Sequence, residues 1–218
     1  MPSCTYEKRF SVPVAGIDEA GRGPLAGPVV AACVHIPNHT FPGIRKVKDS
    51  KQLNGLQREA LFTEITRHCA FGIAVADVEE IDTINILEAS FLAMHRAVDA
   101  MHLAFNVGIN TFLIDGNMKP RGMEAHDCHP IIKGDDKSYS IACASILAKV
   151  TRDRIMRQLH EDFPHYGWNT NVGYSTPDHW EALNKHGPCQ HHRQSFDPVR
   201  AIIPPPLKRA TYKDGLFD

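Results

Sequence analysis

The sequence lacks the long hydrophobic run and the apolar leader that mark membrane and exported proteins. No apolar stretch approaches the roughly 18 residues that a membrane-spanning helix needs. The first ten residues, MPSCTYEKRF, contain no continuous apolar segment like that of a signal peptide. We therefore expect a soluble, cytoplasmic protein that has no membrane partner.

The six cysteines lack the paired spacing of a disulfide framework or a zinc module. No Cys-x-x-Cys pair occurs, and Cys33, Cys69 and Cys143 lie in apolar segments, where free cysteine packs as a small hydrophobic residue. This usage is typical of a reduced compartment. The tract CQHH at 189–192 matches no standard zinc module, so we expect no structural zinc.

The sequence also lacks an excess of charge of either sign, since its formal net charge is −1. A neutral balance does not exclude nucleic acid, because such a protein needs only a local basic face. Basic residues gather in two stretches, 149–157 and 185–200. A solvated helix face is the commoner explanation of such a cluster, so the stretches alone prove nothing.

The chain of 218 residues suits one domain and contains no internal repeat. We expect a single domain over residues 1–200, with a C-terminal helical part at about 163–200, and a tail at 201–218. Apolar runs bounded by Gly and Pro predict strands at Val12–Ile17, Pro28–Ile36, Phe71–Val78, Thr111–Ile114 and His129–Ile132. Helical spacing and cap residues predict helices at Leu56–His68, Ile84–Ala104, Ser140–Leu159 and Pro177–Lys185.

This order of elements predicts an α/β protein with a mixed sheet and helices on its faces. The first three strands have simple connections, which favours an antiparallel meander. The later strands alternate with helices. The helix predicted at Ser140–Leu159 begins with small residues, so we expect that face to lie tightly against the sheet.

Acidic residues follow three of the predicted strands. Asp18 and Glu19 follow the first apolar run, Asp115 follows the fourth, and either Asp135 or Asp136 follows the fifth. Crowded carboxylates repel each other and raise each other's pKa, and a divalent cation that takes oxygen ligands relieves this repulsion. The alternative is an ordinary solvated acidic turn. Convergence of the acids would suit two Mg²⁺ or Mn²⁺ ions and phosphodiester cleavage.

Several motifs together resemble one family over nearly everything from Val14 to about Val199. They are GIDEAGRGPLAGPV, DSKxL, IDGN, KGD, ASILAKVTRD, GYxTxxH and HHRxSF, in that order. The chain resembles a type 2 ribonuclease H, ribonuclease HII of the bacterial kind. This resemblance implies a ribonuclease H-like fold with a five-stranded mixed sheet, flanking helices and a small C-terminal helical part.

The resemblance also implies the functional residues. The metal-binding acids of the family fall on Asp18, Glu19, Asp115 and Asp135, the last chosen over Asp136 because it directly follows Lys-Gly. The Gly-Arg-Gly loop falls on Gly21, Arg22 and Gly23, and its backbone is expected to recognise the ribose 2′-hydroxyl. Glycine allows the close backbone approach that this needs, and the 2′-hydroxyl distinguishes RNA from DNA. Further substrate contacts are implied for Tyr174 at the following sugar, Lys51 near the scissile phosphate and Lys149 at backbone phosphates.

The implied activity is that of a metal-dependent endonuclease with two Mg²⁺ or Mn²⁺ ions. It cuts on the 5′ side of ribonucleotides embedded in duplex DNA and degrades the RNA of RNA/DNA hybrids, acting as a monomer. The chain departs from the family pattern at Ser175, Ala142, Cys143 and Gln194, and none of these is an expected metal ligand. Two alternatives are a resolvase-type DNA nuclease of the same superfamily and a hybrid-binding protein that does not cut. The Leu216-Phe217 pair in the tail is only a weak candidate for a partner-binding peptide.

Overall fold

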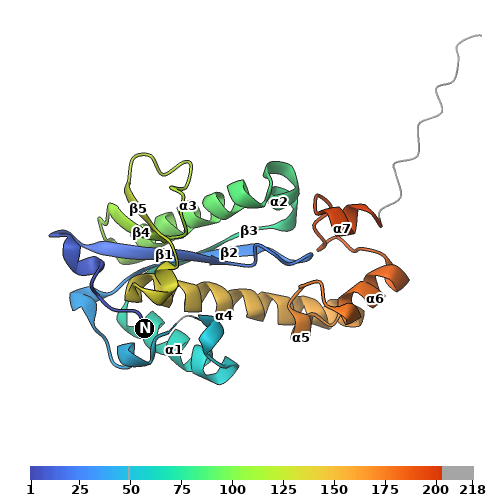
Figure 1. The fold of residues 1–218 in the computed structure, drawn as a ribbon, viewed down its shortest axis with the longest axis horizontal. Coiled ribbons are helices and arrows are strands. Elements are labelled where there is room, and N and C mark those ends of the chain that lie inside the picture. The colour runs from blue at the N-terminus through green and yellow to red at the C-terminus, as the bar shows by residue number, and fades with distance from the viewer. Residues whose placement is uncertain (49, 203–218) are drawn as a thin grey trace, which may run out of the picture.

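A five-stranded mixed sheet with helices on both faces forms the centre of the protein (Figure 1). The computed structural model describes residues 1–48 and 50–202. The strands are β1 (Val14–Ala20), β2 (Val29–His35), β3 (Ala70–Ala76), β4 (Thr111–Asp115) and β5 (Asp127–Ile131). Their order in the sheet is β3-β2-β1-β4-β5; β1, β2 and β3 form an antiparallel meander, whereas β4 and β5 run parallel to β1. The predicted mixed sheet and meander are confirmed.

Two helical layers enclose the sheet, and three short helices lie at one end of it (Figure 1). The helices are α1 (Gly55–His68), α2 (Val78–Ile84), α3 (Ile86–Phe105), α4 (Tyr139–Asp162), α5 (Trp168–Asn171), α6 (Pro177–His186) and α7 (Asp197–Arg200). Single turns of 3-10 helix lie at Glu7–Arg9, Pro37–His39, Ile44–Lys46, Ser50–Gln52, Gly134–Asp136 and Pro164–Tyr166. Figure 1 shows α2 and α3 over one face and α1 and α4 over the other. None of these helices is long and apolar enough to cross a membrane.

The alternation of side chains along the strands divides the core into two layers. Ile17 and Cys33 face α3, where they pack with residues such as Met101. Val34 faces the opposite side and packs with Ile65 of α1 and the start of α4. Because both faces are covered, β2 is buried almost throughout and reads as a continuous apolar run.

Two glycines allow the helices to approach the sheet closely. A Cβ atom at Gly16 of β1 would lie 2.2 Å from the Ser140 carbonyl carbon of α4, and one at Gly72 of β3 would lie 2.0 Å from the Ala97 carbonyl oxygen of α3. Neither position has room for a side chain. The small residues at the start of α4 are fully buried on the same contact, which confirms the tight packing expected for that face.

A buried carboxylate fixes the start of α4. Glu7 is 2% exposed and accepts hydrogen bonds from the Ser138 hydroxyl (2.6 Å), the Ser140 hydroxyl (2.8 Å) and the Ser140 amide (2.9 Å). An anion at this place is favoured by the unpaired amides and the dipole at a helix N-terminus. The N-terminal segment is thereby attached to the helix that carries much of the site.

Three local predictions were wrong, and each has a physical reason. The first strand continues past Ile17 to Ala20, because β2 goes on pairing with it on one side. The helix predicted at Ile84–Ala104 begins at Ile86 as α3, because Asn85 takes a positive φ of 69° and its side chain caps α3; α2 at Val78–Ile84, just before it, was not predicted. The loop predicted after Pro164 contains a 3-10 turn and α5.

The predicted α1 and α6 are confirmed, with side-chain caps at Asn54 and Thr176. From residue 203 onward the predicted tail, including Leu216-Phe217, lies outside the described residues. Asp49, the first residue of the DSKxL motif, also lies outside them. The domain boundary at 200 therefore stays a prediction.

The close contacts at the two glycines predict a loss of stability on enlargement. Gly16→Ala and Gly72→Ala should each lower the free energy of unfolding by about 1–3 kcal/mol, because overpacking shifts backbone against backbone. Gly55→Ala at the start of α1 is the matched control, since a Cβ there meets nothing within 4 Å. It should leave stability equal or raise it by up to about 1 kcal/mol. Urea denaturation measures all three, and wild-type stability of Gly16→Ala would contradict the account.

Candidate active site

One cavity of about 340 Å³ brings together all ten side chains and loop positions expected from the sequence. It lies where β1 and β4 end and where the Gly21–Gly23 loop begins. The expected residues on its wall are Asp18, Glu19, Gly21, Arg22, Gly23, Lys51, Asp115, Asp135, Lys149 and Tyr174. Ala20, Ser50, Ser145 and Arg152 complete the lining.

The four acids reach the cavity from three different kinds of position. Asp18 and Glu19 lie inside β1, not beyond its end as expected. The pairing of β1 with β4 ends at Ile17, so from Asp18 onward β1 pairs only with β2. Asp115 is the last residue of β4, and Asp135 lies in the 3-10 turn that follows β5. The acids therefore converge at the point where the parallel half of the sheet stops.

Asp18 is a buried carboxylate among other acids. It is 5% exposed, and its Oδ1 accepts the Glu19 amide at 2.7 Å. Burial raises its pKa well above the ordinary value, and the nearby charges of Glu19 and Asp115 raise it further. A hydrogen bond from the Ser145 side chain acts in the opposite direction. Without a bound cation, ionisation of Asp18 therefore costs free energy in the folded protein.

Glu19 has one oxygen with no partner. Its Oε1 lies 3.4 Å from the Arg22 guanidinium, whereas its Oε2 is buried and accepts no hydrogen bond. Burial raises the Glu19 pKa; Arg22 lowers it and Asp115 raises it. A buried acceptor without a donor is rare in folded proteins, so this oxygen suggests a missing ligand.

The remaining acids are fixed by neighbouring amides. Asp115 Oδ1 accepts the Gly134 amide at 2.6 Å, and Asp135 Oδ1 accepts the Asp136 amide at 3.0 Å. Asp136 does not line the cavity, and its carboxylate accepts from the Gln52 amide group at 3.1 Å. Of the two neighbouring acids, the structure thus places the expected one in the cavity.

The donor set fits a hard divalent cation. All four groups offer carboxylate oxygens, which suit Mg²⁺ or Mn²⁺ better than softer metals, and the unpartnered Glu19 oxygen needs a positive neighbour. Among the described residues, no three His, Cys, Asp or Glu side chains are grouped closely enough to hold an ion by themselves. Water or substrate oxygens would complete the coordination, as is usual for Mg²⁺.

The glycine loop and Tyr174 face each other across the cavity. Gly21 has a positive φ of 99°, which favours glycine. A Cβ at Gly23 would lie 3.7 Å from the Tyr174 ring, and that ring is 46% exposed. The Tyr174 carbonyl accepts a hydrogen bond from His179 at 2.9 Å, and His179 in turn contacts buried Trp168 and His192. The Tyr174 side chain is therefore exposed, whereas its backbone carbonyl is fixed by the buried His179.

The two expected lysines reach the cavity from two elements that contact each other. Lys51 comes from the 3-10 turn Ser50–Gln52, which Ser50 joins to Ser145 of α4 through a 2.9 Å hydroxyl contact. Lys149 comes from α4 and forms an ion pair with Asp153 at 2.7 Å.

The departures from the family pattern leave the carboxylates untouched. Ala142 and Cys143 are fully buried in the packed face of α4. Gln194 is exposed, and its backbone amide is held by Asp82 at 2.9 Å.

Sequence reasoning missed two buried arginines beside the loop. Arg152 and Arg193 were counted with the surface basic stretches, but they are 1% and 0% exposed. Arg154 and Arg157 do lie outside, where both pair with Glu59. The available signal was their place in the family motifs. Arg152 lies in ASILAKVTRD and Arg193 in HHRxSF, and neither arginine has a role among the expected metal ligands or substrate contacts.

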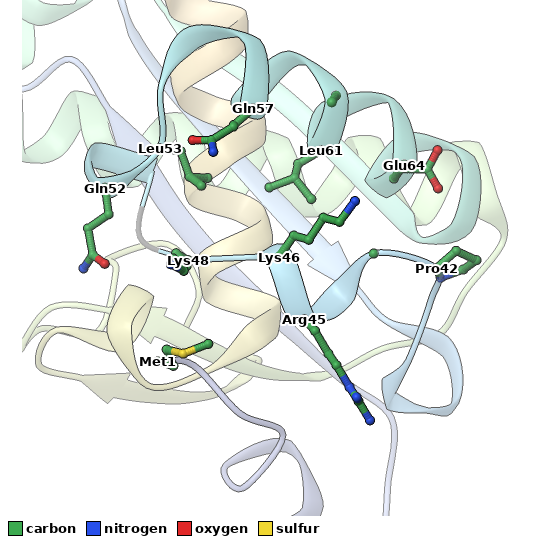
Figure 2. A pocket seen from close by; sticks show the side chains of 12 residues that line it. Met1, Pro42, Arg45, Lys46, Lys48, Gln52, Leu53, Gln57, Leu61 and Glu64 are labelled. Atoms are coloured by element: carbon green, nitrogen blue, oxygen red, sulfur yellow. The ribbon is translucent and has the colours of Figure 1, made fainter.

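A second, larger cavity of about 930 Å³ lies beneath α1 and carries no comparable chemistry (Figure 2). Figure 2 shows Lys46 extending toward α1 and Arg45 pointing away from it. Glu64 is the one acid among the lining residues that the structure describes. A single carboxylate beside basic groups does not form a divalent cation site. The larger of the two cavities is therefore not the candidate active site.

Comparison with known sequences agrees with this geometry. The family model described as Ribonuclease HII matches residues 15–199. A protein named Ribonuclease HII from Burkholderia thailandensis is 52% identical over 189 residues, which covers 86% of this chain and 84% of that one. Another of that name from Cereibacter sphaeroides is 51% identical over 192 residues, covering 87% and 86%.

Solved structures share the fold. The ribonuclease H2 of Pyrococcus horikoshii has a TM-score of 0.71 at 28% identity, with 88% of this chain and 97% of that one covered. The RNase HII from Archaeoglobus fulgidus, solved in a PCNA:RNase HII complex, gives 0.69 at 29% identity, with 89% and 98% covered. Bst-RNase HIII in complex with Mn²⁺ gives 0.71 at 20% identity, with 92% and 72% covered, and supports the fold.

The raised pKa of Asp18 predicts that its charge destabilises the metal-free protein. A carboxyl whose pKa is raised by folding favours the folded state when protonated, so its penalty grows as pH rises from the ordinary value of 3.8 through the raised one. Asp18→Asn in EDTA at neutral pH should therefore raise the melting temperature by about 2–4 °C, the shift given by 1 kcal/mol in a chain of this size. Below pH 3.8 the difference should vanish.

Thermal unfolding by circular dichroism measures this effect. Asp136→Asn is the matched control, since that acid lies outside the cavity, and its melting temperature should not rise. A melting temperature of Asp18→Asn that is lower than wild type at neutral pH would contradict the electrostatic account.

Proposed function

Because the chain belongs to the ribonuclease HII family and is an endoribonuclease acting on RNA/DNA hybrids and on ribonucleotides in DNA, we propose that the four-carboxylate cavity is its catalytic centre. The supporting observation is that Asp18, Glu19, Asp115 and Asp135 line one cavity with the glycine loop. The acids supply metal ligands and the loop supplies a means of selecting the sugar.

Divalent metal dependence is general for the family, and the four acids are the proposed ligands. The unpartnered Oε2 of Glu19 and the raised pKa of Asp18 support this assignment. Two bound Mg²⁺ or Mn²⁺ ions would activate the attacking water and stabilise the leaving oxygen. The protein's own task is to keep the carboxylates in place, which it does with the Gly134 amide at Asp115 and the Glu19 amide at Asp18.

The proposed reaction is hydrolysis on the 5′ side of the ribonucleotide. A water oxygen forms the new bond to phosphorus, and the 3′-oxygen of the preceding nucleotide leaves, so the products carry 3′-hydroxyl and 5′-phosphate ends. In DNA this nick starts the removal of the ribonucleotide.

The remaining residues bind and orient the substrate. The amides of the Gly21–Gly23 loop donate to the ribose 2′-hydroxyl, and Tyr174 presents its exposed ring to the sugar that follows. Lys51 contacts the scissile phosphate and Lys149 the backbone phosphates, where positive charge contributes a salt-dependent share of affinity. These contacts favour a ribonucleotide that is followed by DNA.

We place this activity in the cytoplasm and assign it to a monomer. Every residue of the proposed centre comes from one chain, so no second copy is needed to complete it. The proposed macromolecular partners are the RNA/DNA hybrid and the DNA duplex with embedded ribonucleotides.

Incision of a defined duplex tests the proposal. The substrate is a duplex with one ribonucleotide, beside an all-DNA duplex of the same sequence, each with Mg²⁺, Mn²⁺ or EDTA. Wild type should nick only the ribonucleotide duplex and only with metal. Asp18→Asn and Asp135→Asn should each lower the rate at least about a hundredfold, because loss of a metal ligand removes several kcal/mol of transition-state stabilisation.

Asp136→Asn is the matched control and should keep near wild-type incision, because Asp136 turns away to Gln52. Near wild-type incision by Asp135→Asn would refute the assignment. Cutting of the all-DNA duplex would favour a resolvase-type nuclease, and binding without any cutting would favour a hybrid-binding protein.

A further inference from the structure

Two fully buried arginines lie directly beneath the glycine loop and have no acidic partner. Arg152 of α4 is 1% exposed and Arg193 is 0% exposed. Neither forms an ion pair with any carboxylate in residues 1–48 and 50–202. Burying a charge is costly unless hydrogen bonds or an opposite charge compensate, so the partners of these groups indicate what they do.

Every partner of the two guanidinium groups is a backbone carbonyl. Arg152 donates to Pro28 (3.0 Å), Ala26 (3.0 Å) and Val172 (2.9 Å). Arg193 donates to Gly27 at 3.0 Å through Nε and to Arg22 at 2.9 Å, and a third nitrogen donates to Gly21 at 2.5 Å and Pro28 at 3.2 Å. The carbonyls of the loop from Gly21 to Pro28 thus turn inward toward positive charge.

The direction of these carbonyls sets the direction of the amides. In a trans peptide the C=O and N–H groups point in opposite directions, and the chain contains no cis peptide among its described residues. Because Arg193 holds the Gly21 and Arg22 carbonyls, the amides of Arg22 and Gly23 point away from it. Within the described structure these two amides donate no hydrogen bond to the protein. They are left for a ligand in the cavity that Gly21, Arg22 and Gly23 line.

Arg193 is itself held from several sides. Its backbone amide donates to the Leu25 carbonyl at 2.9 Å, and its guanidinium lies over the Phe196 ring at 5.1 Å. Asp82 of α2 accepts the amides of the next two residues at 2.9 Å. Burial lowers the pKa of Arg193 to about 9, which still leaves it charged at neutral pH. The planar fork of arginine suits several carbonyls at fixed angles, which a lysine ammonium on a flexible stem cannot match.

We propose that Arg193 is a positioning residue that aims the Arg22 and Gly23 amides at the 2′-hydroxyl of the target ribonucleotide. Arg152 packs against Gly21 but donates its hydrogen bonds to Ala26, Pro28 and Val172, not to the two carbonyls that set those amides. The inference rests on the proposed role of Gly21–Gly23 in selecting ribose. It adds that selection depends on a buried charge remote in sequence from the loop.

Kinetics with two duplexes tests the role of Arg193. Incision of the single-ribonucleotide duplex gives kcat and KM, and the all-DNA duplex of the same sequence, added as a competitor, gives Ki. Contacts that both duplexes make contribute equally to Ki and KM and cancel in their ratio. The ratio of Ki to KM therefore reports the preference for ribose. Arg193→Lys should lower this ratio about tenfold, the effect of misaligning two ordinary hydrogen bonds, while Ki stays near wild type.

Gly72→Ala is the stability control, because it overpacks β3 against α3 and Gly72 does not line the cavity. Its melting temperature should fall, but its ratio should stay within about twofold of wild type, since a Cβ there meets only α3 and leaves the loop untouched. A purely structural role of Arg193 would lower kcat through loss of folded enzyme and leave the ratio unchanged.

The outcomes separate this inference from the proposed function. A wild-type Ki equal to KM would contradict ribose selection by the glycine loop. A wild-type preference that folded Arg193→Lys retains would overturn only the inference. If Arg193→Lys does not fold, Phe196→Leu replaces it, since it removes the ring under the guanidinium. Its ratio should then fall about threefold, for a partial loss of alignment, and an unchanged ratio would contradict the proposal.

Discussion

The direct contact of α4 with β1 at Gly16 is the constraint on which the site depends. With no side chain between helix and strand, the register of α4 along β1 is fixed to within a fraction of a turn. The same helix carries Ser145 to Asp18, places Lys149 on the cavity wall and brings Arg152 beneath the loop. A larger residue at position 16 would therefore shift acids, lysine and arginine together. The geometry of the cavity therefore depends on the packing of the core.

Charges of opposite sign are buried on the two sides of the glycine loop. The carboxylates of Asp18 and Glu19 are buried beside one another with raised pKa values, and cations relieve that repulsion. On the other side, Arg152 and Arg193 are buried without acids and are satisfied only by carbonyl dipoles. Between the halves runs the glycine loop. If cations bind the carboxylates as proposed, a phosphate that approaches this loop would meet positive charge on both sides.

Sequence patterns could predict the sheet, most helices and the acids because those depend on local signals. Apolar runs bounded by Gly and Pro predicted the strands, simple connections predicted the meander, and helical spacing predicted the helices that Asn54 and Thr176 cap. The extension of β1 through Asp18 could not be predicted, since it depends on pairing with a strand that outlasts β4. Nor could the burial of Arg193, because a guanidinium reads as a surface group unless its partners are known. Its partners are backbone carbonyls. Every residue has one, so the sequence does not show which carbonyls accept from Arg193.

The proposed metal ligand Glu19 and the proposed sugar-selecting loop are joined directly at the end of β1. Glu19 and Gly21 are two residues apart, and this short segment is paired on one side only, with β2. Arg22 contacts Glu19 at 3.4 Å with its side chain while Arg193 holds its carbonyl. A ligand that draws on the Arg22 and Gly23 amides therefore acts on the same few bonds that orient the Glu19 carboxylate. Because the contact between Arg22 and Glu19 is long and Arg22 is half exposed, that contact is weak, and a cation at Glu19 would replace it.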